Sequence, residues 1–166
     1  MDLWDREVSS FGNKVQALES PVLTGLALGA IRSAFYLLES QNVEIFPSSR
    51  RGLIVRAIES GGIVGRGGGG EIELAERFLA DYDSLPDVAL APPVGPFMMG
   101  LVRLFEEAPS GLSPDGLMEI LWSCHESILM SRISGRYSIH DEELDSICNE
   151  SINKQKILLE SALGGA

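Results

Sequence analysis

Cysteine and positive charge are both scarce in this 166-residue sequence. The two cysteines, Cys124 and Cys148, are too few for a disulfide framework, and too few for a structural zinc site without histidine. Lysine and arginine total 13 against 24 acidic residues, so the formal net charge is −11. Because a phosphate backbone is bound by a basic face, this balance argues against a nucleic acid partner. It favours a basic protein partner, since complementary charge speeds encounter.

Long hydrophobic runs are also missing. The longest uncharged stretches, residues 20–31 and 88–102, are shorter than the ~20 residues that span a bilayer, and the second contains three prolines. The first residues, Met1 to Glu7, carry acids where a secretory signal carries positive charge. We therefore expect a cytoplasmic protein with neither a membrane span nor an export signal.

Hydrophobic residues recur at spacings of three and four, the period of an amphipathic helix, and no segment shows sustained strand alternation. A helix is predicted over roughly residues 2 to 18. Ser20 followed by Pro21 is typical of a helix start, and the helix predicted from there to about Ser40 is apolar nearly all round, so we expect it at the centre of the domain. The helix over residues 2 to 18 is predicted from one apolar stripe, which consists of Trp4, Val8, Phe11, Val15, Leu18 and Val22.

Glycine and proline divide the rest of the chain. A short helix from Ser48 or Ser49 is predicted to end at Gly61-Gly62, within a flexible glycine-rich loop over 61–70. A proline-rich connection over 85–96 separates a helix that opens at Glu71 from the next, near Phe97.

Serines mark the last two predicted helices, at Ser113-Pro114 and at Ser138. The pattern as a whole predicts an all-α fold: a single domain over residues 1–166, built as a compact bundle of about six to seven helices.

No catalytic motif or metal site is indicated. The nitrogen and sulfur donors are Cys124, His125, His140 and Cys148, and the adjacent Cys124 and His125 point about 100° apart on a helix. His125 lies on an apolar stripe, so we expect a hydrogen-bonded core histidine, and Cys148 is expected to pack as a small apolar residue. We predict no catalytic residue, no bound metal and no cofactor.

Charge is unevenly distributed along the chain. Six acids and one arginine lie between Glu71 and Asp87, and six acids and two lysines lie between Asp141 and Glu160. If these two acidic helices were neighbours, they would form a negative face able to block a basic active site. Our leading hypothesis is therefore a non-enzymatic acidic inhibitor of a basic protein, as an immunity protein is for a toxin nuclease. Its expected partner contacts are Glu71, Glu73, Glu76, Asp81, Asp83, Asp141, Glu142 and Asp145.

A second hypothesis starts from the four arginines between Arg50 and Arg66 and the glycines that follow. Exposed backbone amides and guanidinium groups suit an anionic ligand, so a helical enzyme or small-ligand binder is the alternative. The loop lacks the lysine and hydroxyl residue of a P-loop and ends in an acid, which favours a plain flexible loop. In this alternative the anion is held by Arg51, Arg56, Arg66 and Gly67.

Two apolar segments are also candidates for contact surfaces. The stripe from Trp4 to Val22 would serve a self-associating structural subunit, as a homodimer interface. The stretch from Pro92 to Gly100 would expose methionines to a partner, although its burial in the core is favoured.

Overall fold

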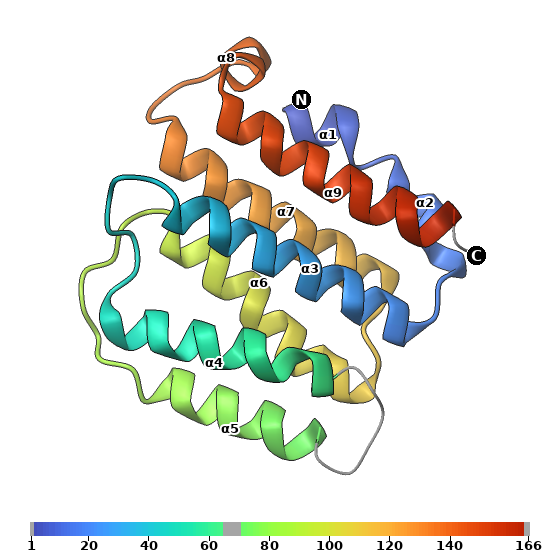
Figure 1. Ribbon diagram of the computed structural model, residues 1–166, viewed down its shortest axis with the longest axis vertical. Helices are drawn as coiled ribbons and strands as arrows, with labels where there is room; N and C mark the ends of the chain where they lie inside the picture. Colours follow the sequence, from blue (N-terminus) through green and yellow to red (C-terminus); the bar gives the residue numbers. More distant parts are fainter. Residues whose placement is uncertain (1, 65–70, 165–166) are drawn as a thin grey trace.

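The structure is a computed structural model that describes residues 2–64 and 71–164. The predicted all-α class is confirmed: the described residues form helices packed into one bundle, with no strand among them (Figure 1). They fold into nine α-helices, more than expected, because two predicted helices are broken. The α-helices are α1 Leu3–Glu7, α2 Phe11–Lys14, α3 Ser20–Glu39, α4 Ser48–Val64, α5 Glu71–Asp83, α6 Val94–Glu107, α7 Pro114–Arg132, α8 Ile139–Leu144 and α9 Ser146–Gly164; short 3-10 turns are η1 Val15–Ala17 and η2 Ala108–Ser110.

Helix α3 lies at the centre of the bundle, as expected, and packs against α4, α6, α7 and α9 (Figure 1). Among the described residues it is the helix that is long and apolar enough to cross a membrane by length and composition. Ten of its residues are buried against other helices. The apolar character of α3 is therefore accounted for by its place in the protein core.

The predicted helix over residues 2–18 is wrong in its continuity. The chain forms α1, α2 and η1 in succession, with a turn at Ser9 and Ser10. The Ser9 hydroxyl donates to the carbonyl oxygen of Asp5 at 2.5 Å, a local bond by which serine competes with regular helix. The break lets successive parts of the segment follow the bundle: α1 packs on α8 and α9, and α2 packs on α7.

The predicted helix end at Gly61-Gly62 is also wrong, because α4 continues to Val64. A Cβ atom built on Gly61 would lie 2.6 Å from Cδ1 of Leu28 on α3. Gly61 therefore serves close helix packing instead of ending the helix. Gly29, on α3, has the same role toward α9, since a Cβ there would lie 3.2 Å from Leu158.

The second broken helix lies at the C-terminal end of the bundle. Ser138 caps the helix start as predicted, in a reciprocal capping box with Asp141. The helix ends after six residues, and Asp145 adopts an extended conformation before α9 begins. This joint turns α8 away from the axis of α9 (Figure 1).

The predicted proline-rich connection over 85–96 is too long, because helix α6 already begins at Val94 and includes Pro96 in its first turn. The apolar stripe of α6 packs inward. Val94, Phe97 and Met98 are buried, whereas Met99 is 70% exposed. The expected burial of this stretch is thus found, with one methionine left on the surface.

Candidate functional site

A fully enclosed polar network joins α1, α7, α8 and α9. His125 Nδ1 lies 3.1 Å from the Ser151 hydroxyl, and His125 Nε2 lies 3.4 Å from Glu142 Oε1. The other carboxylate oxygen of Glu142 accepts a hydrogen bond from the backbone amide of Leu3 at 2.9 Å. His125 and Glu142 are 0% exposed and Ser151 is 4% exposed.

These residue types are those of a hydrolytic triad, but their burial denies a substrate access to the Ser151 hydroxyl. The predicted core role of His125 is confirmed by its hydrogen bonds and burial. Burial raises the pKa of the Cys124 thiol to about 12, and burial followed by the charge of Asp145 raises that of Cys148 to about 12. Both sulfurs are held as neutral packing groups. Within the described part of the chain, no group of three or more histidine, cysteine and acidic side chains is placed to hold a metal ion.

Asp145 holds the joint between α8 and α9. Its Oδ1 accepts hydrogen bonds from the amides of Ile147 and Cys148 at 3.0 and 2.9 Å, and Arg132 donates to Oδ2 at 3.0 Å. Burial raises the pKa of Asp145, but the Cys148 amide and the Arg132 guanidinium outweigh burial and lower it below the ordinary value of 3.8. Asp145 is thus a stabilising residue and not a free surface contact.

Asp145→Ala is expected to lower the free energy of unfolding by about 1–2 kcal/mol near neutral pH, the usual cost of losing a helix cap. Because the folded pKa is lowered, this stabilisation is present above pH 3.8 and is lost as the pH falls through the folded pKa. Urea unfolding near neutral pH and at strongly acidic pH measures the change. Asp145→Asn is the control, since it keeps an acceptor but does not titrate; an alanine penalty that is the same at both pH values would contradict the assignment.

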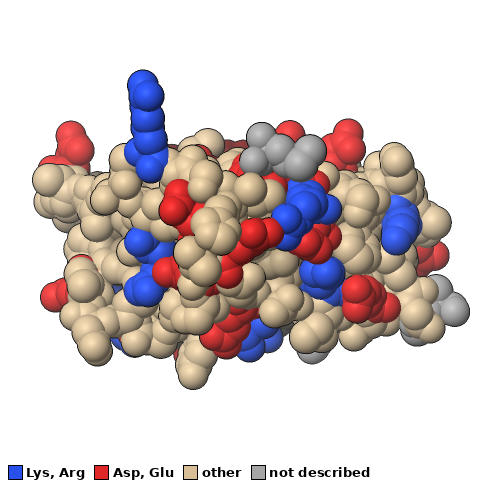
Figure 2. All heavy atoms as spheres, turned by 90° about the horizontal axis from the view of Figure 1, so that it is seen from above, with Lys and Arg blue, Asp and Glu red and all other residues tan. Residues whose placement is uncertain are grey.

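The two acidic helical regions are not neighbours. Helix α5 packs on α4 and α6, and α8 packs on α9 and α1, at opposite edges of the bundle (Figure 1). Seen from above, acidic and basic side chains are interspersed (Figure 2). Arg6 pairs with Glu143 at 2.6 Å and Lys156 pairs with Glu7 at 3.2 Å. The continuous negative face on which the sequence hypothesis depended is therefore not formed.

The expected partner contacts divide accordingly. Glu142 is enclosed and Glu71 is only 8% exposed, so neither is available as a surface contact. The sequence alone did not distinguish these two buried acids from the exposed acids near them. On a short helix, the spacing of acidic residues does not show which side chain faces the core. The exposed members of the set are Glu73, Glu76, Asp81, Asp83 and Asp141.

The proposed anion-binding arginines are also separated. Arg51 pairs with Glu39 across α3 and α4, whereas Arg56 faces helix α5. Arg66 and Gly67 lie outside the described residues. Of that set, Arg56 is the residue that lines a pocket without an ion pair among the described residues.

The apolar stripe proposed for self-association is used inside the molecule. Trp4, Val8, Phe11 and Val15 are buried, and Val22 remains 42% exposed. Little of the stripe is left for a second copy.

Two surface hollows of about 350 and 400 Å³ share Trp122 of α7, and we call them together the α7 groove. The Trp122 ring stands edge-on to Trp4, with ring centroids 5.5 Å apart, so a buried side chain supports its position. The first hollow is lined by Pro92, Trp122, Glu126, Leu129, Met130, Ile133, Ser134, Gly135 and Tyr137, and the second by Asp2, Trp4, Asp5, Met118, Glu119 and Trp122.

The charge of the α7 groove has one sign. Four carboxylates, those of Asp2, Asp5, Glu119 and Glu126, lie among the described lining residues, and no lysine, arginine or histidine does. Glu119 pairs with Arg103, which stands outside the lining. The other three carboxylates have no ion pair among the described residues. Apolar and aromatic surface is thus bordered by uncompensated negative charge.

A sequence signal for this groove existed. Met118, Trp122, Glu126 and Met130 are spaced by four residues and share one side of α7. This side adjoins the buried stripe of α7 that includes Leu121. The two patterns overlap in the sequence, so the surface stripe was not recognised separately. The contribution of Asp2 and Asp5 had no such signal, because only the packing of α1 brings them to α7.

Comparison with known proteins gave no relative: no family model, no curated protein and no solved structure matches this chain.

Proposed function

We propose that this protein is a non-enzymatic binding protein whose α7 groove receives a basic segment of a partner protein. The supporting observation is a partly exposed tryptophan, Trp122, that lies beside four carboxylates and no basic lining residue. Tryptophan is among the residues that contribute most binding energy at interfaces. Carboxylates at the border steer a basic partner and set its orientation.

The expected occupant carries at least one apolar side chain between lysine or arginine residues. The apolar side chain would contact Trp122, Met130 and Ile133, while the cations would approach Asp5 and Glu126. Methionine suits such a surface because its flexible side chain adapts to different shapes. On this proposal the partner binds at α7 and not at α5, which carries most of the contacts expected from the sequence.

A charge-reversal experiment distinguishes the two surfaces. The partner is first captured from the host with the tagged protein and purified, and association kinetics are then measured at low and high salt. Asp5→Lys/Glu126→Lys is expected to slow association about tenfold or more at low salt, with a smaller effect at high salt. Glu73→Lys/Glu76→Lys is the matched control, because it makes the same change in net charge on the exposed side of α5.

Either of two results would contradict the α7 assignment: a groove variant that binds like the wild type, or a larger loss in the α5 variant. Trp122→Ala adds a readout that long-range charge does not control, since it should raise the dissociation rate. Unchanged dissociation would remove Trp122 from the interface.

The immunity-protein form of this proposal concerns the partner's identity. A nuclease domain is basic because it binds a phosphate backbone, so it is one partner class with the required charge. This form predicts that the captured partner is toxic when expressed alone and that co-expression of the present chain relieves the toxicity. A captured partner without nuclease activity would reject this form and leave the groove assignment in place.

A further inference from the structure

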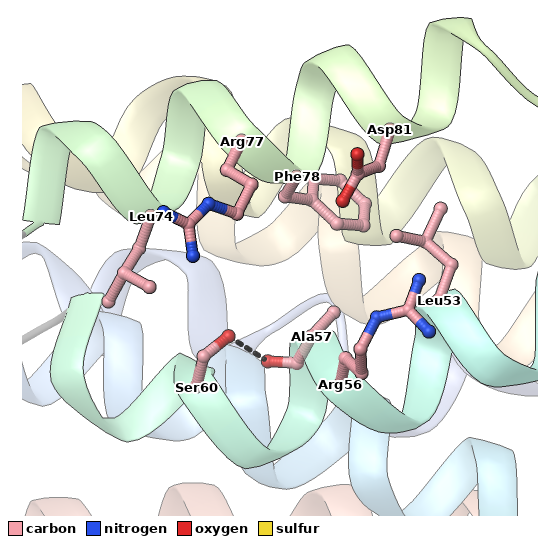
Figure 3. A pocket seen from close by; sticks show the side chains of 8 residues that line it. All are labelled: Leu53, Arg56, Ala57, Ser60, Leu74, Arg77, Phe78 and Asp81. Carbon is pink, nitrogen blue, oxygen red and sulfur yellow. Dashed lines mark hydrogen bonds between the residues drawn. The ribbon is translucent and has the colours of Figure 1, made fainter.

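A small pocket between α4 and α5 carries charge of the opposite sign to the α7 groove. Its volume is about 170 Å³, and its lining is mostly apolar (Figure 3). Arg56 from α4 and Arg77 from α5 extend into the gap between the two helices from either side. The lining residues are Leu53, Arg56, Ala57, Ser60, Leu74, Arg77, Phe78 and Asp81.

Neither guanidinium group has an ion pair among the described residues, although both line one pocket with a carboxylate. Arg6, Arg51, Arg103 and Arg132 each contact a carboxylate. Asp81 lines the same pocket but makes no ion pair with either arginine. The pocket therefore holds two uncompensated arginines and one acid, with a formal charge of +1.

The polar groups of the pocket suit an acceptor-rich ligand. A guanidinium presents several N–H donors in a fixed plane and has no acceptor, and two of them from facing helices match the oxygens of a phosphoryl group. The Ser60 hydroxyl donates to the Ala57 carbonyl oxygen at 3.2 Å, so its hydrogen is already used. Phe78 is 5% exposed and, with Leu53, provides apolar surface for the rest of a ligand.

We propose that the α4–α5 pocket binds a small phosphomonoester, with its phosphoryl group between Arg56 and Arg77 and its apolar part against Phe78. This site keeps Arg56 from the anion-binding hypothesis and replaces Arg51, which pairs with Glu39, by Arg77, which was not among the residues predicted from the sequence. The site is independent of the α7 groove, since the two share no lining residue.

Phenyl phosphate is the probe, and benzoate is its control, because benzoate keeps the ring and replaces the phosphoryl group by a carboxylate. Binding is measured by NMR titration of the arginine Nε–Hε signals at constant ionic strength and mildly alkaline pH, where the phosphate is a dianion. Saturable shifts of the Arg56 and Arg77 signals are expected, with phenyl phosphate binding tighter than benzoate. Equal affinity for the two probes, or no saturable shift with phenyl phosphate, would overturn the proposal.

Three substitutions give effects of different sign. Arg56→Gln and Arg77→Gln should each weaken phenyl phosphate binding about tenfold, whereas Asp81→Asn should strengthen it by removing a repulsive charge. Arg32→Gln is the matched control, because Arg32 also lacks an ion pair among the described residues but lines a different pocket, between α3 and α4. An equal loss of phenyl phosphate affinity in Arg32→Gln would show a nonspecific effect of surface charge. No loss of affinity in the Arg56 and Arg77 variants would show that these arginines do not hold the phosphoryl group. Either result would reject the site.

Discussion

Replacing Glu142 by alanine is expected to lower the free energy of unfolding by about 2–6 kcal/mol, because two buried polar groups would each lose a hydrogen-bond partner at about 1–3 kcal/mol. The carboxylate is 0% exposed and accepts from two groups, the amide of Leu3 at 2.9 Å and His125 Nε2 at 3.4 Å. Its removal leaves both donors buried without an acceptor, and an unmade buried hydrogen bond carries the full desolvation cost of the group. Urea unfolding followed by circular dichroism measures the difference.

Glu143→Ala is the matched control, because it removes the same side chain from the next position of α8. Glu143 pairs with Arg6 at the surface, and an exposed ion pair contributes about 0–1 kcal/mol. Equal losses of unfolding free energy in the two variants would mean that the enclosed network stabilises the fold no more than a surface ion pair does. A near-zero loss in Glu142→Ala would mean that water or a rearranged α8 replaces its hydrogen bonds.

Replacing Trp4 by alanine is expected to cost about 3–5 kcal/mol, as for other large buried aromatic residues. The indole is 7% exposed, packs edge-on against Trp122, and donates a 2.9 Å hydrogen bond from Nε1 to the Gln155 side chain. Gln155 in turn donates to the Leu121 carbonyl oxygen at 2.8 Å. Trp4 thus connects α1 to α9 and to the base of the α7 groove. Its loss should therefore weaken the packing of α1 against α9 and the support of the Trp122 ring.

Two further substitutions test this account of Trp4 by thermal and urea unfolding. Trp4→Phe keeps a ring but leaves the Gln155 acceptor without its donor, so a cost of about 1–3 kcal/mol is expected. Val22→Ala lies on the same stripe of the sequence but at an exposed position, and a change within about 0.5 kcal/mol is expected. If Val22→Ala were as costly as Trp4→Ala, the stripe would act as a single unit, contrary to the observed fold.

Local sequence patterns were most informative where a helix is long and its interactions are local. The helix from Ser20 to Glu39, its central position and the cap at Ser138 follow from hydrophobic spacing and from hydrogen bonds within one turn. The same rules failed at Gly61-Gly62, where α4 continues. A glycine pair has the same local preference whether it ends a helix or admits a neighbouring one, and the nearby Leu28 side chain decided between these outcomes.

The sequence by itself determined the helical class, the excess of negative charge and the core position of His125, because each depends on composition or on the spacing of residues along one helix. The tertiary structure alone decided which charges meet. It placed the acids of α5 and α8 at opposite edges, enclosed Glu142, and brought Asp2 and Asp5 to Trp122. Arg56 and Arg77 line one pocket for the same reason, since contacts between different helices depend on packing and leave no periodic signal.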